Sequence, residues 1–501
     1  MRALFCQFSY YNGRRDLLDA NREFGLNKYN KTNISGIPTV EELRSKLNGD
    51  SSARQCIASL FDANTFVETS AYAKRSISDF ISTESTNELE GVITGYGAID
   101  GKLVFAFVED DSRMGGVIDD RHAKKITDLY KLAISNGAPI IGVFNSNGTD
   151  IFEGTTGIAA YGKIMASVIK ASGTIPQIAY VSGKCIGTSA AIAAMFDFVV
   201  KADGAQLYVT SPMLTKTDAA HNCLISYSAD EAQCITYIRS IVSYIPDNSS
   251  AGIAVEECTD NLNRKLGDLD FGGEALSAIS VIADNSVFYD VAPAFAPSVS
   301  TVFATVGGIK CGIVANSFVK NQGKITADVA KKVSKFVNFC NAYSMPVITL
   351  VDSLGLDTTK ENEENNFASE LAKLAYAYAL ADCPKVTVVM GHAIGASFAL
   401  LGSKSLGADL VYAIDNSEIA ALSAESGVAF AWDKYITLDT TREELVAEWR
   451  ANVSSPAVAA ASGEIDDIIC VNELRARICS ALLMLSAKGN AAVSRRKILP
   501  L

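Results

Sequence analysis

The feature that most constrains this chain is a long repeat within its own sequence. Residues 137–148 are similar to residues 343–355, and residues 175–188 are similar to residues 383–396. Matched prolines and glycines lie 207 positions apart in the first pair of segments and 208 apart in the second. A unit of this length is a whole domain rather than one repeat of a solenoid. The sequence therefore predicts two domains of one fold, related by internal duplication.

Each copy contains apolar runs that are typical of buried strands. The runs are short, rich in β-branched residues and without alternation, as in parallel strands covered on both faces. A stretch with apolar residues at helical spacing precedes the first strand of each copy. The predicted strands are Ile140–Phe144, 175–181, 347–351 and 386–390, and the predicted helices are 124–135 and Ala327–Ala342. This order of strands and helices indicates an α/β fold.

The length of 501 residues also requires more than one hydrophobic core. We predict a first domain of residues 1–255 and a second domain of residues 256–501. Residues 1–89 have no counterpart in the second copy and are more polar than the rest. We expect this extension to be helical or irregular and to pack on the surface or at a subunit contact.

The composition narrows the classes of function. The net charge is −12 and no basic cluster is visible, which argues against a nucleic-acid partner. Hydrophobic residues make up 49% of the chain, an excess that fits self-association. The eleven cysteines contain no C-x-x-C pair, so they indicate buried thiols in a reducing compartment rather than disulfides or a zinc site.

No segment has the pattern of a membrane span or a secretion signal. The longest uncharged stretch, residues 291–309, is interrupted by prolines and glycines. The apolar start at residues 3–6 is too short for a signal peptide. We therefore expect a cytoplasmic enzyme, and one without a metal site.

Each copy also has a strand that ends in a glycine turn and opens a helix of small residues. The turns are Gly187-Thr188 and Gly395-Ala396. The first N–H groups of a helix have no intrahelical partner, and glycine permits close approach by a ligand. The two neighbouring amides at each turn could therefore form an oxyanion hole. Alternatively, the turns only let each helix pack closely on its strand, and spacing alone does not decide between the two.

Other catalytic signatures are missing or isolated. No G-x-x-x-x-G-K-[ST], G-x-S-x-G or H-E-x-x-H motif is present. His122, His221 and His392 are dispersed, and for His392 we expect solvation or a local hydrogen bond rather than ligand contact. Cys185 has no evident activating base, so we expect it to be buried and inert. Glu425 could orient a helix or a subunit contact.

Motifs distributed over most of the chain resemble those of one enzyme family. They lie at residues 60–68, 95–101, 115–116, 138–142, 307–308, 402–409, 455–460, 463–468 and 498–501. Through them the chain resembles the carboxyltransferase subunits of acyl-CoA carboxylases, methylmalonyl-CoA carboxyltransferase and sodium-pumping acyl-CoA decarboxylases, which act with biotin.

This resemblance implies two crotonase-like domains and an active site between the first domain of one subunit and the second domain of another, in a homohexamer. A short acyl-CoA would bind on the first domain, where Gly187 and Thr188 would stabilise the thioester enolate. Biotin would bind on the second domain, where Gly395 and Ala396 would stabilise its ureido oxyanion. The further biotin-side positions are Gly355, Leu356 and Ala399.

The phosphates of CoA need cations, and three follow the diglycine Gly115-Gly116. We predict that Arg121, Lys124 and Lys125 bind them, with a solvated helix face as an equal alternative. The predicted CoA side is completed by Asn147 and Gly148.

Biotin itself must come from a partner, because none of the eight methionines is followed by lysine, as the usual attachment sequence requires. The resemblance therefore implies a separate biotin carboxyl carrier protein. Its other implied partners are a biotin carboxylase or membrane decarboxylase subunits, which would decide between carboxylation and decarboxylation.

The chain departs from the family's sequence pattern at four places in or near the predicted site. Asp150 replaces an arginine, Thr188 replaces a glycine, residues 354–356 replace Pro-Gly-Phe, and Ala399 replaces an aspartate that helps choose the acyl chain. The resemblance therefore does not identify the acyl-CoA. Two alternatives stay open: a non-catalytic assembly subunit of such a complex, and a crotonase-type acyl-CoA enzyme that works without biotin.

Overall fold

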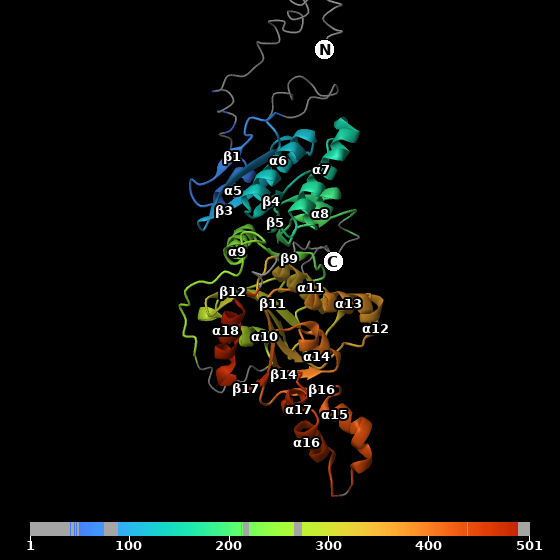
Figure 1. Cartoon of the computed structure of the whole chain (residues 1–501). Helices are drawn as coiled ribbons and strands as arrows, with labels where there is room; N and C mark the ends of the chain where they lie inside the picture. Colours follow the sequence, from blue (N-terminus) through green and yellow to red (C-terminus); the bar gives the residue numbers. More distant parts are fainter. Residues whose placement is uncertain are drawn as a thin grey trace, which may run out of the picture. The chain divides into compact units, whose positions relative to one another are not determined.

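The computed structural model describes residues 50–74, 89–211, 213, 220–264, 273–437 and 439–488, together with 41, 45 and 47. The chain divides into Met1–Asp50 and one compact unit, Ser51–Leu501 (Figure 1). Residues 1–40 and 75–88 of the predicted extension, and the family motif at residues 498–501, lie outside the described residues.

The first half of the compact unit is built, in its described residues, on a seven-stranded sheet with the order β1-β2-β3-β4-β5-β7-β9. The pairs β1–β2 and β2–β3 are antiparallel, and the remaining pairs are parallel. Two short strands, β6 and β8, form a separate parallel ribbon. The strands are β1 (Val67–Thr69), β2 (Val92–Ile99), β3 (Lys102–Glu109), β4 (Ile140–Phe144), β5 (Gln177–Val181), β6 (Lys184–Ile186), β7 (Phe198–Ala202), β8 (Gln206–Tyr208) and β9 (Ile225–Ala229).

The second half repeats this arrangement around an eight-stranded sheet. Its strands are β10 (Phe288–Asp290), β11 (Val299–Val306), β12 (Ile309–Asn316), β13 (Val347–Ser353), β14 (Lys385–Ile394), β15 (Leu410–Ile414), β16 (Glu418–Ala420) and β17 (Asp467–Ile469). β14 pairs with β15 along its first part and with β16 at its end, so one long strand takes the places of β5 and β6. The predicted α/β fold and its duplication are confirmed.

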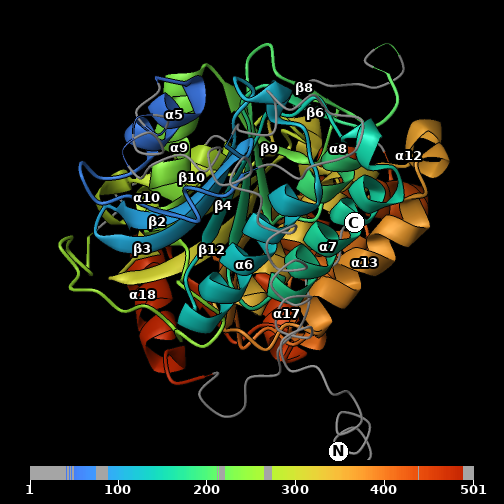
Figure 2. The same cartoon turned by 90° about the horizontal axis from the view of Figure 1, so that it is seen from above.

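Corresponding helices occur in both halves. The first half has α5 (Ser52–Leu60), α6 (Asp120–Asn136), α7 (Thr155–Ala171), α8 (Thr188–Ala193) and α9 (Glu231–Tyr244); their counterparts are α10 (Ala275–Ile282), α11 (Ala327–Ala342), α13 (Phe367–Ala379), α14 (Ala396–Leu400) and α18 (Leu474–Leu485). α6 packs beside α7 (Figure 2), and α11 packs beside α13 (Figure 1). The second half also contains α12 (Lys360–Glu364), α15 (Ala424–Gly427), α16 (Arg442–Asn452) and α17 (Pro456–Ala461).

Helix capping explains where the two predicted helices begin. The bounds predicted for α11 are confirmed, and the side chain of Thr326 caps it by accepting from the N–H of Val329. α6 begins four residues before the predicted start, at Asp120, because the side chain of Asp119 accepts from the N–H of His122 at 2.7 Å.

Part of the predicted N-terminal extension belongs to the fold of the first half. α5 buries Ala53, Cys56, Ile57 and Leu60, and β1 pairs with β2. These residues include a helix, as expected, but they also complete the core and the edge of the sheet.

The two halves share a hydrophobic core in addition to their own cores. The ring of Phe198 on β7 lies 4.6 Å from that of Phe339 on α11 and 5.8 Å from that of Phe303 on β11. The hydroxyl of Tyr343 donates to Asp197 across the same boundary. Within the described ranges, no helix combines the length and apolar character that crossing a bilayer requires.

A carboxylate and an arginine close the first β-hairpin. Asp62, two residues after α5, accepts the N–H groups of Asp100 and Gly101 in the β2–β3 turn at 3.1 and 3.0 Å. Arg239 of α9 donates to Asp62 at 2.8 Å and to the carbonyl of Leu60 at 2.8 Å. The hydrogen bond from Arg239 holds the pKa of Asp62 below its ordinary value. We call this arrangement the first latch.

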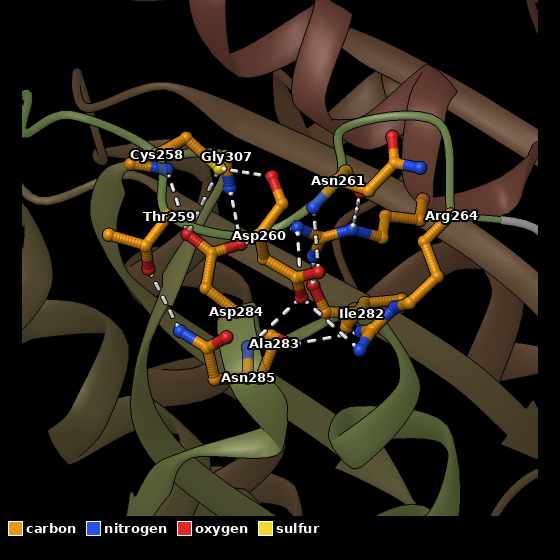
Figure 3. Close-up of polar contacts among 12 residues, drawn as sticks. Cys258, Thr259, Asp260, Asn261, Arg264, Ile282, Ala283, Asp284, Asn285 and Gly307 are labelled. Atoms are coloured by element: carbon orange, nitrogen blue, oxygen red, sulfur yellow. Dashed lines mark hydrogen bonds and ion pairs between the residues drawn. The ribbon is translucent and has the colours of Figure 1, made fainter.

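The same arrangement closes the second hairpin. Asp284, two residues after α10, accepts the N–H groups of Gly307 and Gly308 in the β11–β12 turn at 2.9 and 2.8 Å. Arg475 of α18 donates to Asp284 at 2.6 Å and to the carbonyl of Ile282. Around this second latch, Asp260 and its neighbours add polar contacts (Figure 3).

Candidate functional site

The first predicted turn joins β6 to α8. Gly187 has φ 61° and ψ −127°, a conformation that only glycine adopts readily. A Cβ on Gly187 would meet no atom within 4 Å, so the conformation rather than the space requires glycine. The N–H of Gly187 donates to the carbonyl of Tyr208 on β8 at 3.0 Å.

The second turn, between β14 and α14, has the same geometry. Gly395 has φ 59° and ψ −133°, and its N–H donates to the carbonyl of Ala420 on β16 at 2.8 Å. A cavity of about 410 Å³ lies at this turn, and most of its lining is apolar, including Phe398, Ile419 and Val458. The two turns are thus equivalent in conformation and in backbone bonding.

This bonding changes which amides are available for a ligand. The N–H groups of Gly187 and Gly395 are already engaged by neighbouring strands, so neither glycine offers a donor. The next residues, Thr188 and Ala396, are the first of their helices, and their N–H groups have no hydrogen-bond acceptor within the described part of the chain. Each turn therefore offers the amide after the glycine. The side chain of Thr188 is exposed.

The loops that follow β4 and β13 are also alike. The hydroxyl of Ser146 accepts the N–H of Gly148 at 3.0 Å, and that of Ser353 accepts the N–H of Gly355 at 3.2 Å. The φ angles of the two glycines are 108° and 105°. Each glycine carbonyl in turn accepts a backbone N–H, from Ile118 in the first half and from Ile325 in the second. The predicted residues Gly148 and Gly355 therefore hold the same place.

The structure brings several predicted CoA-side residues together. The N–H of Asn147 donates to the carbonyl of Gly115 at 2.9 Å, and a Cβ on Gly115 would lie 2.0 Å from the amide nitrogen of Asn147. A Cβ on Gly116 would lie 2.7 Å from the carbonyl oxygen of Asn145. The diglycine is thus needed for close contact with the loop after β4. Lys184 joins this group, because its Nζ donates to the side-chain oxygen of Asn147 at 2.8 Å.

The three predicted cations have different surroundings. Arg121 is exposed, and Lys124 is exposed with its Nζ 2.5 Å from Asp128. Lys125 is buried, and its Nζ donates to the carbonyl of Val92 at 2.5 Å. Burial lowers the pKa of Lys125 to about 8. Lys125 therefore supports β2 and is not placed for a solvent-borne phosphate.

Lys184, which was not among the predicted site residues, is exposed and lies three residues before Gly187. Its place inside the glycine-turn motif is the sequence signal that marks it. Its only hydrogen-bond partner among the described side chains is the neutral amide of Asn147, so its charge is not compensated by a carboxylate there.

Behind the loop after β4 lies a buried group of ionisable side chains. His122 is fully buried, with Nδ1 3.6 Å from Glu90 and Nε2 3.9 Å from Glu109. Burial raises the pKa of Glu109 to about 7, and its carboxylate accepts the N–H of Asn145 at 2.7 Å. Burial also acts to raise the pKa of Glu90, but the adjacent His122, the N–H of Gly91 and Lys125 together outweigh it and hold that pKa below its ordinary value. Asp150, which stands where the family pattern has an arginine, is also buried and follows Asn145 by five residues in the sequence.

On the biotin side, the predicted residues lie on adjoining elements. Leu356 follows Gly355 and bridges to Ile325, and Ala399 is exposed on α14. Before the second turn, Nδ1 of His392 lies 2.9 Å from Asp352, so the predicted local hydrogen bond is confirmed. Nothing places these residues against a ligand, so their roles stay predictions.

Two further predictions concern single residues. Cys185 is buried, and burial raises its pKa well above the ordinary value, which confirms an inert thiol. Glu425 pairs with Arg450 of α16 at 2.5 Å, which agrees with a role in orienting a helix, and the alternative of a subunit contact stays a prediction. Nowhere in the described ranges do three or more His, Cys, Asp or Glu side chains gather to hold a metal ion.

Comparison with known proteins identifies the family. The carboxyl transferase domain matches residues 45–224 and 220–498. Methylmalonyl-CoA decarboxylase subunit alpha of Veillonella parvula is 32% identical over 480 residues, which cover 90% of this chain and 94% of that protein. The mitochondrial propionyl-CoA carboxylase beta chain of Homo sapiens is 31% identical over 469 residues, which cover 88% and 86%.

A solved structure shares the fold of this chain over most of its length. The transcarboxylase 12S crystal structure, a hexamer assembly with methylmalonyl-CoA and methylmalonic acid bound, matches with a TM-score of 0.80 and 29% identity over 91% of this chain and 93% of that one. The family match, these relatives and the two similar sheets lead to one conclusion: the chain belongs to the carboxyl transferase domain family, that of the carboxyltransferase subunits of biotin-dependent acyl-CoA carboxylases and decarboxylases.

Proposed function

We propose that this chain transfers a carboxyl group between biotin on a separate carrier protein and a short acyl-CoA, by way of an enolate. The observation that carries this proposal is the matched pair of turns, each with one free main-chain N–H beside a glycine in the same unusual conformation. The relatives named above support the substrate class.

The free amides supply the catalysis. An N–H group held in place by the folded backbone stabilises an oxyanion without reorganising during the reaction. We assign the Thr188 N–H to the thioester oxygen as it becomes an enolate, and the Ala396 N–H to the ureido oxygen. Gly187 and Gly395 set the direction of these donors instead of donating themselves.

The second turn fits the ureido ring of biotin. Its cavity has mostly apolar walls that suit an uncharged ring, with Ser462 and Glu464 as polar residues, and the neighbouring Ala396 offers a donor to a carbonyl oxygen. Biotin, when bound, would carry the carboxyl group to or from the acyl chain. We keep Gly355, Leu356 and Ala399 as residues that surround it.

On the other side, we propose that Gly115, Gly116, Asn147 and Gly148 shape the acyl-CoA site. Arg121, Lys124 and Lys184 are the proposed cations. The contact between Lys124 and Asp128 is solvent-exposed and therefore weak, so Lys124 can turn to a phosphate. Lys125 is left out of this set because it is buried against β2.

We also propose that residues 1–255 of one subunit face residues 256–501 of another across the active site, in a hexamer like transcarboxylase 12S. The biotin carrier is a separate protein, because no methionine here is followed by lysine. A biotin carboxylase or membrane decarboxylase subunits would set the direction of transfer, and the cytoplasm is the proposed location.

Decarboxylation of methylmalonyl-CoA and malonyl-CoA by the purified chain, with and without free biotin, tests this function. We expect turnover that depends on biotin. Turnover without biotin would favour a crotonase-type enzyme, and a folded hexamer inactive on every acyl-CoA would favour an assembly subunit. Sedimentation as a monomer would contradict the shared site.

Proline variants test the donors directly. Proline suits the first position of a helix but has no N–H, so T188P and A396P remove one donor each. We expect kcat to fall about 100- to 1,000-fold for each. T155P is the matched control, because Gly154 before α7 has the same conformation, φ 57° and ψ −126°. An equal loss in T155P, or full activity in a folded T188P, would contradict the assignment.

A further inference from the structure

A second cavity lies between the two halves of the chain, away from the free amides. Its volume is about 190 Å³. The first half contributes the segment from Ala194, the residue after the end of α8, to Phe198 on β7. The second half contributes α11 and the segment before β11. Six-residue α8 separates Ala194 from the Thr188 donor by about 9 Å along its axis.

Five of the residues that line this cavity are phenylalanines. Phe196, Phe198, Phe295, Phe336 and Phe339 all line it. Phe198 and Phe339 meet at an interplanar angle of 65°, which is the edge-to-face contact that aromatic rings prefer. An engineered apolar cavity of about 150 Å³ holds a benzene molecule. This one is therefore large enough for a single aromatic ring with a small substituent.

Most polar groups at the cavity are already bonded. Asp197 accepts the N–H of Gln177 at 2.9 Å and the hydroxyl of Tyr343 at 3.3 Å. Lys332 is buried and donates to the carbonyls of Phe295 and Val299 at 2.9 and 2.8 Å. At the rim, Lys331 lies 3.3 Å from Asp328.

Lys335 differs from these groups. It lines the cavity, is only partly exposed, and has no hydrogen-bond or ion-pair partner among the described residues. Burial lowers the pKa of Lys335, and the nearby carboxyl group of Asp197 acts in the opposite direction without forming an ion pair with Lys335. Burial raises the pKa of Asp197 to about 7. A ligand carboxylate would give Lys335 the direct ion pair that it lacks among the described residues.

We propose that this cavity is a binding site for a small aromatic monocarboxylate, with the ring among the phenylalanines and the carboxylate on Lys335. The site takes neither CoA nor biotin, so it goes beyond the proposed carboxyl transfer. Its ligand contacts the end of the helix whose first amide is the proposed donor.

Isothermal titration of the full-length chain with benzoate tests this site, with benzyl alcohol as the uncharged match. We expect benzoate to bind at least 10-fold more tightly than benzyl alcohol, because a hydrogen bond to a charged group contributes more than a neutral one. K335M should weaken benzoate binding about 10-fold and leave benzyl alcohol binding unchanged. K360M, on exposed α12, is the matched control and should bind like the wild type.

Two further measurements locate the bound molecule. A194L fills the cavity and should abolish binding of both compounds, while saturating CoA should leave benzoate binding unchanged. Competition between CoA and benzoate would place benzoate in the acyl-CoA site and overturn the proposal. Equal benzoate affinity in K335M and wild type, or no binding at 10 mM (roughly the weakest affinity that the assay needs to detect), would also overturn it.

Discussion

The two latches have the same geometry but lie in different surroundings. In the first, the side chains of Arg239 and Asp62 keep 24% and 30% of their exposure; in the second, Arg475 and Asp284 keep 0% and 7%. An exposed ion pair adds little stability, whereas breaking a buried one leaves an uncompensated charge. Duplication has therefore preserved the bonds to the hairpin turn, but the stability that depends on them should differ between the halves.

A second difference concerns the ends of β3 and β12. Glu109 and Asn316 hold the same position, the last residue of the strand. Glu109 accepts a backbone N–H from the loop after β4, whereas the amide of Asn316 donates to the carbonyl of Gly323. The first half is thus supported by a titratable group at a place where the second half uses a neutral one.

The largest effect is expected for R475M. The substitution leaves Asp284 buried without its cation, and breaking a buried pair costs about 3–5 kcal/mol. Urea unfolding at fixed protein concentration measures the change in free energy of unfolding. R477M, two residues further along α18 and 46% exposed, is the control and should change it by less than about 1 kcal/mol. Similar losses in both variants would show that the buried pair of Arg475 and Asp284 contributes no more stability than an exposed one.

The matched turn glycines give the next effect. Gly308 has φ 80°, and a Cβ there would lie 2.2 Å from the carbonyl oxygen of Glu256. Gly101 has φ 78° and no atom within 4 Å of such a Cβ. G308A should destabilise the chain by about 3 kcal/mol, from strain and overpacking together. G101A should cost only about 1 kcal/mol, for strain alone. Equal costs in urea unfolding would show that the segment at Glu256 yields easily.

Replacing Glu109 should change how stability depends on pH. Because its folded pKa is about 7 and its unfolded value about 4.5, the folded state binds the extra proton between these pH values. Stability contributed by this group is therefore greatest below pH 4.5 and falls as pH rises towards 7. E109Q keeps an acceptor for Asn145 and should remove that decline, which is on the order of 3 kcal/mol. The Tm of the wild type and of E109Q is measured at several pH values from 4.5 to 7.5. If Tm changed with pH in the same way in both proteins, the prediction would be wrong.

R239M should have the smallest effect. Its ion pair is partly exposed, so we expect a loss of about 1 kcal/mol or less. The loss should shrink further in 1 M NaCl, where the screening length is about 3 Å, whereas the loss in R475M should persist. A salt-independent loss in R239M would mean that its bond to the Leu60 carbonyl matters more than its charge.

The local sequence pattern was sufficient to predict the bounds of elements that are regular and buried. The bounds of β4 and α11 were predicted as the structure has them, because apolar periodicity and a capping Thr326 mark them. β14 runs past its predicted end at Met390, since its last residues pair with β16, which is distant in sequence. Both latches were missed, because each joins residues from opposite ends of its half.

The same limit applies to the candidate site. The burial of Lys125 could have been predicted, since it lies four residues before Leu129 on the buried face of α6. The bonding of the two turn glycines could not, because their acceptors come from β8 and β16, whose pairing depends on the tertiary fold.

Because Gly187 and Gly395 are bonded to neighbouring strands, the groups proposed for catalysis belong to the main chain, whereas the groups that would select the substrate are side chains. Main-chain bonds from the ribbon β6–β8 and from β14–β16 fix where each donor points, and side chains take no part in those bonds. Residues such as Thr188 and Ala399 can therefore vary and reshape the space beside the donor while the donor stays still. A scaffold of this kind can change the acyl-CoA that it accepts by substituting side chains, while the main-chain donors at its reaction centre keep their positions.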